Sequence, residues 1–325
     1  MTDRQESIFS DELRVINLGL EGFAEDLQHH GVDVVNVDWS PPADGNSELV
    51  EAIHTLLRND QSVQEANQET LERFFEVEPE WIDVVPAADA LPDLGPKEIL
   101  HAGPDIDFER MCGPQQRGVI GACVHEGWAD DFDAARKVIE NGDVTISPTY
   151  DYPLVVPMST VVSPSMPLLA VEDPTSEVRI HSTLNEGRGD VQWFGVMNDS
   201  VLDHWEWIRT VLGPALSKAV DALDRKPRVF DCVSEGLLMG DECHVRAGAT
   251  TNELLNALSP GLIEADIDRS TASDVHQFIA DNTLFSLNFT MAACRTAADR
   301  GFDGVKSRTG ATSSRPPSTD SRPPA

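Results

Sequence analysis

The sequence predicts an α/β protein with an N-terminal βαβ unit, a loop-rich mixed α+β middle and a mainly helical C-terminal region. Three observations predict this fold class. Near the N-terminus two short apolar runs flank a helical pattern, the middle repeats Gly, Pro and Ser between short β-like runs, and the last third follows helical spacing. With 325 residues, 40% of them hydrophobic, the chain can bury several packed units.

The first unit is predicted from residues 15–37. Residues 15–20 and 32–37 have the pattern of strands, and residues 22–30 between them have that of a short helix, so we expect a parallel pair with a right-handed crossover. The first turn reads Gly19-Leu-Glu-Gly22, which is an incomplete dinucleotide-binding fingerprint even though Asp38 follows the second strand. A dinucleotide site therefore stays a minor alternative.

The remaining chain is divided by composition. We expect a Rossmann-like α/β unit at 1–95, a loop-rich α/β anion-site region at 96–198, a mainly helical region at 199–305 and a disordered tail at 306–325. Predicted helices are 49–57, 62–75, 132–140, 201–212, 214–223, 253–258 and 274–300, and predicted strands are 82–85, 98–100 and 168–171. The tail has no Val, Ile, Leu or aromatic residue, and its basic composition resembles out-of-frame translation.

Charge excludes several classes of partner. Lys and Arg number 24 against 56 Asp and Glu, a formal net charge of -32, so the surface repels nucleic-acid backbones and anionic membranes. Abundant acid with scarce Lys suggests a halophilic cytosol, where salt screens this charge. The sequence shows neither a long apolar span nor a secretory signal. Five widely spaced cysteines argue against a disulfide scaffold, so we expect a cytoplasmic protein.

Several Gly-rich segments are candidates for binding an anion. Glycine lets a backbone approach a ligand, and consecutive N–H groups form a nest for carboxylate or phosphate oxygens. The segments are 101–105, 111–114, 163–167, 184–189 and 239–244, with Arg117, Arg188 and Arg246 as forked donors. Turn building is the alternative role for each. His125-Glu126 could form an acid–base pair, but neither it nor Asp241–His244 has a zinc spacing, so we expect no metal.

Eight stretches carry a resemblance to one family. They are VINLGLEGFA (15–24), VDWSPP (37–42), LHAGP (100–104), MCGP (111–114), EGWA (126–129), SPSMP (163–167), TLNEG (183–187) and MGDE (239–242). In these stretches the chain resembles a conserved family of unknown function that includes a subunit of bacterial oxamate carbamoyltransferase, from allantoin (ureide) breakdown. The resemblance covers nearly all of residues 13–300.

The resemblance implies a reaction. Phosphate would cleave oxalurate to oxamate and carbamoyl phosphate, together with a succinyl-CoA-synthetase-like partner subunit and with no metal or redox cofactor. The chain departs from the family pattern at 149–152, 156–160, 189–193 and 244–247, and the family pattern continues beyond residue 300, so the chain looks divergent and truncated. The alternative is a non-catalytic paralogue that binds a small molecule or acts as a complex subunit.

We expect the middle loops to converge with residues 241–246 on one cleft, because polar residues and glycines gather there while apolar periodicity lies in the flanking helices. The predicted catalytic residues are His101, His244, Asp241 and Glu242, and the predicted substrate- or anion-binding residues are Gly103, Arg117, Ser163, Ser165, Asn185, Glu186, Gly187 and Arg246. The two arginines would hold anionic oxygens, a histidine would move a proton, and Ser163 or Asn185 would donate to a carbonyl oxygen. For the acids at 241–242, capping of a helix N-terminus is the alternative.

Overall fold

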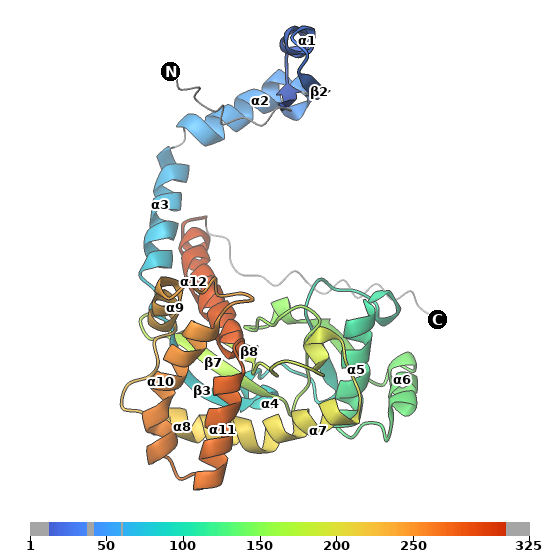
Figure 1. The fold of residues 1–325 in the computed structure, drawn as a ribbon, viewed down its shortest axis with the longest axis vertical. Coiled ribbons are helices and arrows are strands. Elements are labelled where there is room, and N and C mark those ends of the chain that lie inside the picture. The colour runs from blue at the N-terminus through green and yellow to red at the C-terminus, as the bar shows by residue number, and fades with distance from the viewer. Residues whose placement is uncertain (1–12, 38–41, 60, 310–325) are drawn as a thin grey trace, which may run out of the picture. The chain divides into compact units, whose positions relative to one another are not determined.

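The computed structural model describes residues 13–37, 42–59 and 61–309, and it contains two compact units, Met1–Asn67 and Gln68–Ala325 (Figure 1). The strands are β1 (Arg14–Leu18), β2 (Asp33–Val37), β3 (Glu80–Pro86), β4 (Glu98–His101), β5 (Thr145–Pro148), β6 (Val161–Val162), β7 (Pro167–Asp173) and β8 (Val178–Thr183). The α-helices are α1 (Glu21–His29), α2 (Ser47–His54), α3 (Gln61–Phe75), α4 (Ala87–Ala90), α5 (Gly113–His125), α6 (Phe132–Glu140), α7 (Asp199–Trp207), α8 (Gly213–Asp221), α9 (Val229–Leu238), α10 (Gly248–Glu264), α11 (Arg269–Asp281) and α12 (Phe285–Thr309).

The first unit contains the predicted βαβ arrangement. β1 and β2 pair in parallel, from Arg14 opposite Asp33 to Leu18 opposite Val37, and α1 connects them, which confirms the sequence prediction. α1 packs on one face of the pair and buries Ala24. The unit division falls after residue 67, and residues 68–95 group with the second unit because β3 pairs with β7.

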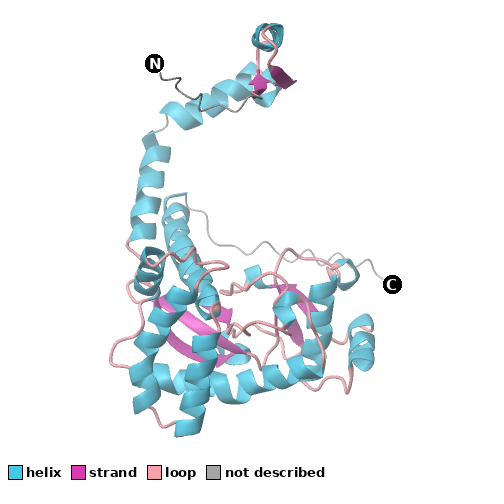
Figure 2. Cartoon of the chain, viewed as in Figure 1, coloured by secondary structure: helices cyan, strands magenta, loops and turns pink. Residues whose placement is uncertain are grey.

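The second unit is built on two three-stranded sheets, shown in magenta in Figure 2. In the first, β7 lies between β3 and β8, and both pairs are antiparallel. In the second, β4 lies between β5 and β6, parallel to β5 and antiparallel to β6. A small buried cluster that includes Leu100, Val162 and Leu168 joins residues of both sheets. The mixed α/β fold with a helical C-terminal region agrees with the predicted fold class.

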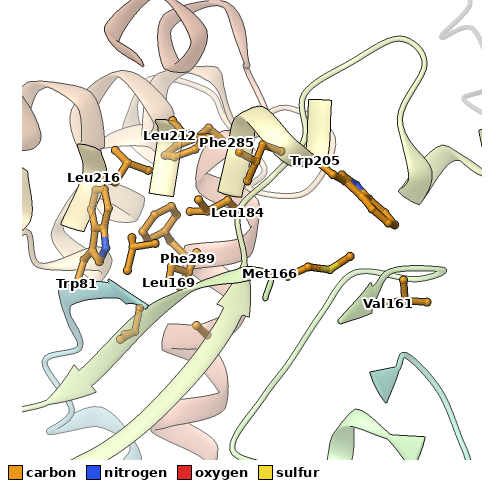
Figure 3. Packing of buried hydrophobic residues seen from close by; sticks show 14 of the residues in the cluster. Trp81, Val161, Met166, Leu169, Leu184, Trp205, Leu212, Leu216, Phe285 and Phe289 are labelled. Carbon is orange, nitrogen blue, oxygen red and sulfur yellow. The ribbon is translucent and has the colours of Figure 1, made fainter. Parts of the chain in front are cut away.

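The main core lies between the first sheet and the C-terminal helices. α8 packs on β3, and α12 packs on β7 and β8. Trp81 is fully buried and meets Phe289 edge-on, with ring centroids 4.6 Å apart. Figure 3 shows both rings beside Leu169 and Leu216, with Leu212 and Phe285 close by. Each such aromatic side chain removes some 150–250 Å² from water, so this cluster is the main apolar support of the fold.

Two helices differ from the sequence prediction. The predicted single helix at 274–300 is wrong, because α11 ends at Asp281 and α12 begins at Phe285. Asn282 makes the break: its backbone leaves helical geometry and its Oδ1 accepts the N–H of Leu284 at 3.1 Å. The expectation of one helix within residues 101–189 is also wrong, because α5 is a second helix there. Its start carries no apolar periodicity, although Pro114 in its first turn is a typical start signal.

Helices α7 and α8 are joined without a loop. Residues Ile208–Leu212 between them form a π-helix, which carries an extra residue per turn. Trp205 on α7 is buried, as the amphipathic pattern predicts, and so are Leu212 and Leu216 at the end of the π-helix and on α8.

Three sequence predictions concern termini and surface chemistry. Residues 306–309 continue α12, and the rest of the predicted tail at 306–325 lies outside the described residues. All five cysteines are free thiols. Among residues 13–37, 42–59 and 61–309, no helix combines the length and the apolar character needed to cross a membrane.

Candidate functional site

The first candidate site lies where the parallel strands β4 and β5 end. Their last residues, His101 and Pro148, are opposite each other, and α5 and α6 connect the strands. Ligands of α/β proteins bind at the carboxyl ends of parallel strands, where loops and helix N-termini gather. Here the loop after β4, with Gly103 at φ +98°, leads into the first turn of α5. We call this place the β4–α5 edge.

His101 is the most unusual group at this edge. Its side chain is fully buried, and its Nδ1–H donates to the Ala102 carbonyl at 2.9 Å. The other ring nitrogen, Nε2, is buried and has no hydrogen-bond partner among the described residues. Because Nδ1 carries the proton, Nε2 of the neutral ring is an acceptor. An unpaired acceptor of this kind is suited to receiving a proton or an N–H group.

Gln192 brings two loops onto the start of α5. Its Nε2 donates to the Ser159 carbonyl at 2.6 Å and to the Pro114 carbonyl at 3.4 Å. Its Oε1 is buried and has no hydrogen-bond partner in the described part of the chain. Ser159 is held at φ +70°, a left-handed conformation that is strained for a residue with a side chain. Gln192 is not among the residues predicted from the sequence, because its role depends on contacts between distant segments and no motif spacing marks it.

Arg117 supplies the positive charge of the edge. Its Nε–H donates to the Gly195 carbonyl at 2.7 Å. Glycines leave room for its guanidinium: a Cβ at Gly113 would lie 3.2 Å from Nη1, and a Cβ at Gly195 would lie 3.2 Å from Nη2. Cys112, the N-cap of α5, makes no side-chain cap, so the first-turn N–H groups are not satisfied from that side chain. Together the guanidinium and the helix N-terminus suit an anion.

A second part of the site is the loop of residues 183–192, which contains the predicted residues Asn185, Glu186 and Gly187. The buried Asn185 side chain accepts the Gly187 N–H at 3.0 Å and donates to Asn288 Oδ1 at 3.2 Å. Asn282 Nδ2 donates to both oxygens of Asn185 at 3.1 Å. Gly187 adopts φ +93°, which only glycine takes without strain. This network of buried amides fixes the loop to the α11–α12 junction.

Glu186 connects this loop to the β4–α5 edge. Its Oε1 accepts the Trp205 indole N–H at 2.8 Å, and its Oε2 accepts the Gln192 backbone N–H at 2.7 Å. Its backbone carbonyl accepts Nε2–H of His204 at 2.8 Å. Burial raises the pKa of Glu186, and these hydrogen bonds only partly offset that rise. Glu186 is therefore an anchor that holds the segment carrying Gln192.

The two predicted serines lie elsewhere along the second sheet and α5. Ser163 follows β6, is fully buried, and has an Oγ without a partner among the described residues. The backbone N–H of Ser165 donates to Glu126 Oε1 at 2.8 Å, and its hydroxyl lies 3.4 Å from His125 Nε2. Burial lowers the pKa of His125. Ser165 thus belongs to a cluster at the carboxyl end of α5, whereas the β4–α5 edge is at its amino end.

The predicted residues 241–246 form a turn between α9 and α10. Asp241 Oδ2 accepts the N–H of Thr250 at 2.7 Å in the first turn of α10, which is the capping role weighed in the sequence analysis. Glu242 Oε1 accepts the N–H of Arg246 at 2.6 Å, and the Arg246 carbonyl accepts the Glu242 N–H. His244 and Arg246 have exposed side chains. That this turn joins the middle loops in one cleft stays a prediction.

Comparisons with known proteins place the chain in a family. Residues 144–309 match the family model of the oxamate carbamoyltransferase subunit AllG. The chain is 35% identical over 296 residues to the uncharacterized protein YahG of Escherichia coli K12, covering 90% of this chain and 62% of YahG. It is 37% identical over 241 residues to the E. coli oxamate carbamoyltransferase subunit AllG, covering 74% of this chain and 58% of that subunit.

A solved structure is similar to the chain in both fold and sequence. The crystal structure of a conserved protein of unknown function from Enterococcus faecalis V583 has a TM-score of 0.71 and 34% identity, covering 74% of this chain and 57% of that one. The chain thus spans about three-fifths of the length of each relative. On the family match and these identities, the chain belongs to the family of the oxamate carbamoyltransferase subunit AllG.

Proposed function

We propose that the chain is a subunit of a cytoplasmic, oxamate carbamoyltransferase-like enzyme that converts oxalurate and phosphate into oxamate and carbamoyl phosphate. The observation that supports the proposal is the β4–α5 edge. It carries the Arg117 guanidinium, a helix N-terminus without a side-chain cap, and two buried acceptors, His101 Nε2 and Gln192 Oε1, that have no partner among the described residues. Family membership suggests the reaction class, since the E. coli relative AllG is named as a subunit of oxamate carbamoyltransferase.

The roles follow from the chemistry that the reaction needs. A phosphate oxygen attacks the ureido carbonyl carbon of oxalurate, the bond from that carbon to the oxamate nitrogen breaks, and that nitrogen takes the proton that phosphate loses. In our proposal Arg117 and the first turn of α5 bind phosphate. Gln192 Oε1 accepts a ureido N–H, and His101 Nε2 moves the proton. Holding both anions together is the main contribution to rate.

The proposal requires a partner, because the relative's name describes a subunit. From the resemblance stated above, we propose a succinyl-CoA-synthetase-like subunit as that partner. The second candidate function is a non-catalytic member of the complex. One observation favours it: three segments that depart from the family pattern border the β4–α5 edge. Residues 149–152 follow β5, residues 156–160 include Ser159, and residues 189–193 include Gln192.

The deciding experiment is an assay of carbamoyl phosphate formation from oxalurate and phosphate in high KCl, with and without candidate partner subunits. Arg117→Ala should lower the rate at least about 100-fold, the scale expected when a charged contact to a reacting group is lost. Arg225→Ala, an exposed arginine on the α8–α9 turn, serves as the matched control. Arg246→Ala then tests whether the α9–α10 turn takes part. If no partner subunit supports turnover, the alternative function, a non-catalytic member of the complex, is favoured.

A further inference from the structure

Three large apolar residues are exposed around the β4–α5 edge, and the reaction scheme above gives them no role. They are Tyr150, Met158 and Phe194, which are 55%, 85% and 55% exposed. A single exposed apolar side chain is common on protein surfaces and needs no explanation. Three that gather around one candidate site indicate a surface that another molecule covers. We call these three side chains the apolar rim.

The topology of the second sheet brings two of these residues to the same end of the sheet. β4 and β5 run in parallel and end there, at His101 and Pro148, and β6 begins there because Val161 is opposite His101. Tyr150 lies in the turn directly after β5, and Met158 lies in the loop directly before β6. Because β4 is the middle strand, the segments that carry Tyr150 and Met158 flank its end.

A hydrogen bond attaches the segment of the third residue to this end. Gln192 Nε2 donates at 2.6 Å to the carbonyl of Ser159, which directly follows Met158. Phe194 is two residues after Gln192, and its ring stacks on Trp193 with ring centroids 4.2 Å apart and planes at 23°. The backbone that carries Met158 and Phe194 is therefore held in place before anything docks, which lowers the entropy cost of binding.

The charges around the apolar rim define what covers it. The exposed charged residues on the loops at 102–107, 149–160 and 183–194 are four acidic and one basic: Asp105, Asp107, Asp151, Asp190 and Arg188. We call the four aspartates the acidic border. A second copy of the chain would place this border against itself, and carboxylates buried without a partner cost free energy even in salt. A surface with basic residues around an apolar centre is complementary to it.

We infer that the apolar rim and the acidic border form the docking surface for a different subunit, which has a basic margin around an apolar centre and covers the β4–α5 edge. The rim packs on the apolar centre of that subunit, and the aspartates pair with its Lys or Arg residues. The identification of this subunit with the partner in the enzyme rests on the proposed function. Its basic margin also offsets the acidic border beside Arg117, where the proposed function places phosphate.

The test is calorimetric titration of the full chain in high KCl with each candidate partner subunit of the proposed function. We expect one of them to bind. Met158→Asp and Phe194→Asp should each weaken this binding at least about 10-fold, the scale expected for an interface anchor. Asp151→Lys should weaken it about 3-fold or more, because ion pairs inside an interface are screened less than exposed ones.

The matched control is Ile263→Asp, since Ile263 is an apolar residue on α10 that is 83% exposed. This variant should bind the partner subunit like the wild type. Melting temperatures at the same KCl concentration show that each variant is folded. Sedimentation velocity of the chain alone reports self-association, which we expect to be absent.

Three results would overturn the inference: no binding of any candidate subunit, wild-type affinity in both Met158→Asp and Phe194→Asp, or self-association that Met158→Asp abolishes. The last result would assign the rim to a second copy of the chain. Failure of the proposed function looks different. If a subunit binds through the rim but oxalurate is not converted, the docking surface stands and the reaction does not. If a subunit supports turnover and both rim variants bind it like the wild type, the reaction stands and the docking surface fails.

Discussion

The loop at 183–192 and the turn at 239–247 have similar compositions, but their side chains form hydrogen bonds over very different sequence separations. Both combine glycine with Asn, Asp or Glu, and both include a family motif. In the first loop, the Asn185 side chain bonds to Asn282 and Asn288, 97 and 103 positions away, at the α11–α12 junction and on α12. The bonds made by the turn's own side chains span at most 9 positions: Glu242 accepts N–H groups within the turn, and Asp241 caps α10. Glycine-rich polar composition therefore identifies both, but only tertiary contacts separate a loop that positions a site from a turn that ends a helix.

Salt concentration should have the largest effect on the stability of the fold. It also sets the conditions under which the loop at 183–192 and the turn at 239–247 are compared. The formal net charge of -32 creates self-repulsion that is unscreened in dilute buffer. We expect the chain to be folded only in concentrated salt, with a thermal midpoint that rises as KCl increases into the molar range. Circular dichroism melts across a KCl series measure this. A midpoint independent of KCl would contradict it, and the two segments could then be compared in ordinary buffer.

Asn185→Ala should give the largest single-residue loss of stability in the comparison. It removes the acceptor of the Gly187 N–H, one of the two acceptors of Asn282 Nδ2 and the donor to Asn288 Oδ1, all within a buried network. Buried groups left without partners cost about 1–3 kcal/mol each, so we expect a loss of about 3 kcal/mol in the free energy of unfolding. Urea unfolding at constant high KCl measures it. A loss below about 1 kcal/mol would mean that the loop is not held by these amides.

Asp241→Ala should cost less, about 1 kcal/mol, because a helix cap is lost and water can replace it. Asp241→Asn keeps an oxygen acceptor and should retain most of the stability. The same urea titration compares both variants with Asn185→Ala. If Asp241→Ala were as damaging as Asn185→Ala, the turn would have to carry tertiary contacts, and the contrast between the two segments would disappear.

Glu186→Gln should change the pH dependence of stability. Burial raises the pKa of Glu186 above its ordinary value of 4.5, so the folded chain holds this proton more tightly than the unfolded chain. Glu186 therefore destabilises the fold progressively as pH rises from about 4.5 through its folded pKa. The unfolding free energy of the wild type relative to Glu186→Gln should fall over that interval and stay level above it. A difference independent of pH would show that the carboxyl is not perturbed.

Much of the fold could be predicted because local pattern determined it. The βαβ arrangement at 15–37 and α6 at Phe132–Glu140 follow from periodicity and turn residues alone. α5 was missed because its packing face depends on glycine: a Cβ at Gly118 or Gly121 would collide with Gln192 or Met197, so small size replaces the usual apolar stripe. The break at Asn282 depends on one side chain that bonds both to its own backbone region and to Asn185.

The types of residue in the candidate site could be predicted from the sequence, but which of these residues lie near one another could not. Glycines and arginines beside turns predict anion binding; in the structure Gly103 lies in the loop before α5 and Arg117 lies on α5, and anion binding stays a prediction. Gln192 could not be found in this way, because an amide between Ser159 and Pro114 has no local signature. Likewise, no spacing distinguishes Ser165, beside His125, from Ser163, whose buried hydroxyl has no partner within the residues that the structure describes.

Because of the π-helix at Ile208–Leu212, the number of residues between α7 and α8 is itself a structural constraint. Each residue of an α-helix advances the side chains by about 100°, so the extra residue shifts the phase between α7 and α8. Trp205 is thereby directed toward Met166 and Val161, while Leu212 and Leu216 face the cluster around Trp81 and Phe289 (Figure 3). Removing one residue from Ile208–Leu212 would rotate α8 relative to α7 by about 100°. The buried side chains of one of these two helices would then face away from the core. At the exposed positions Arg209 and Thr210 we expect substitution to be tolerated, whereas a deletion is not.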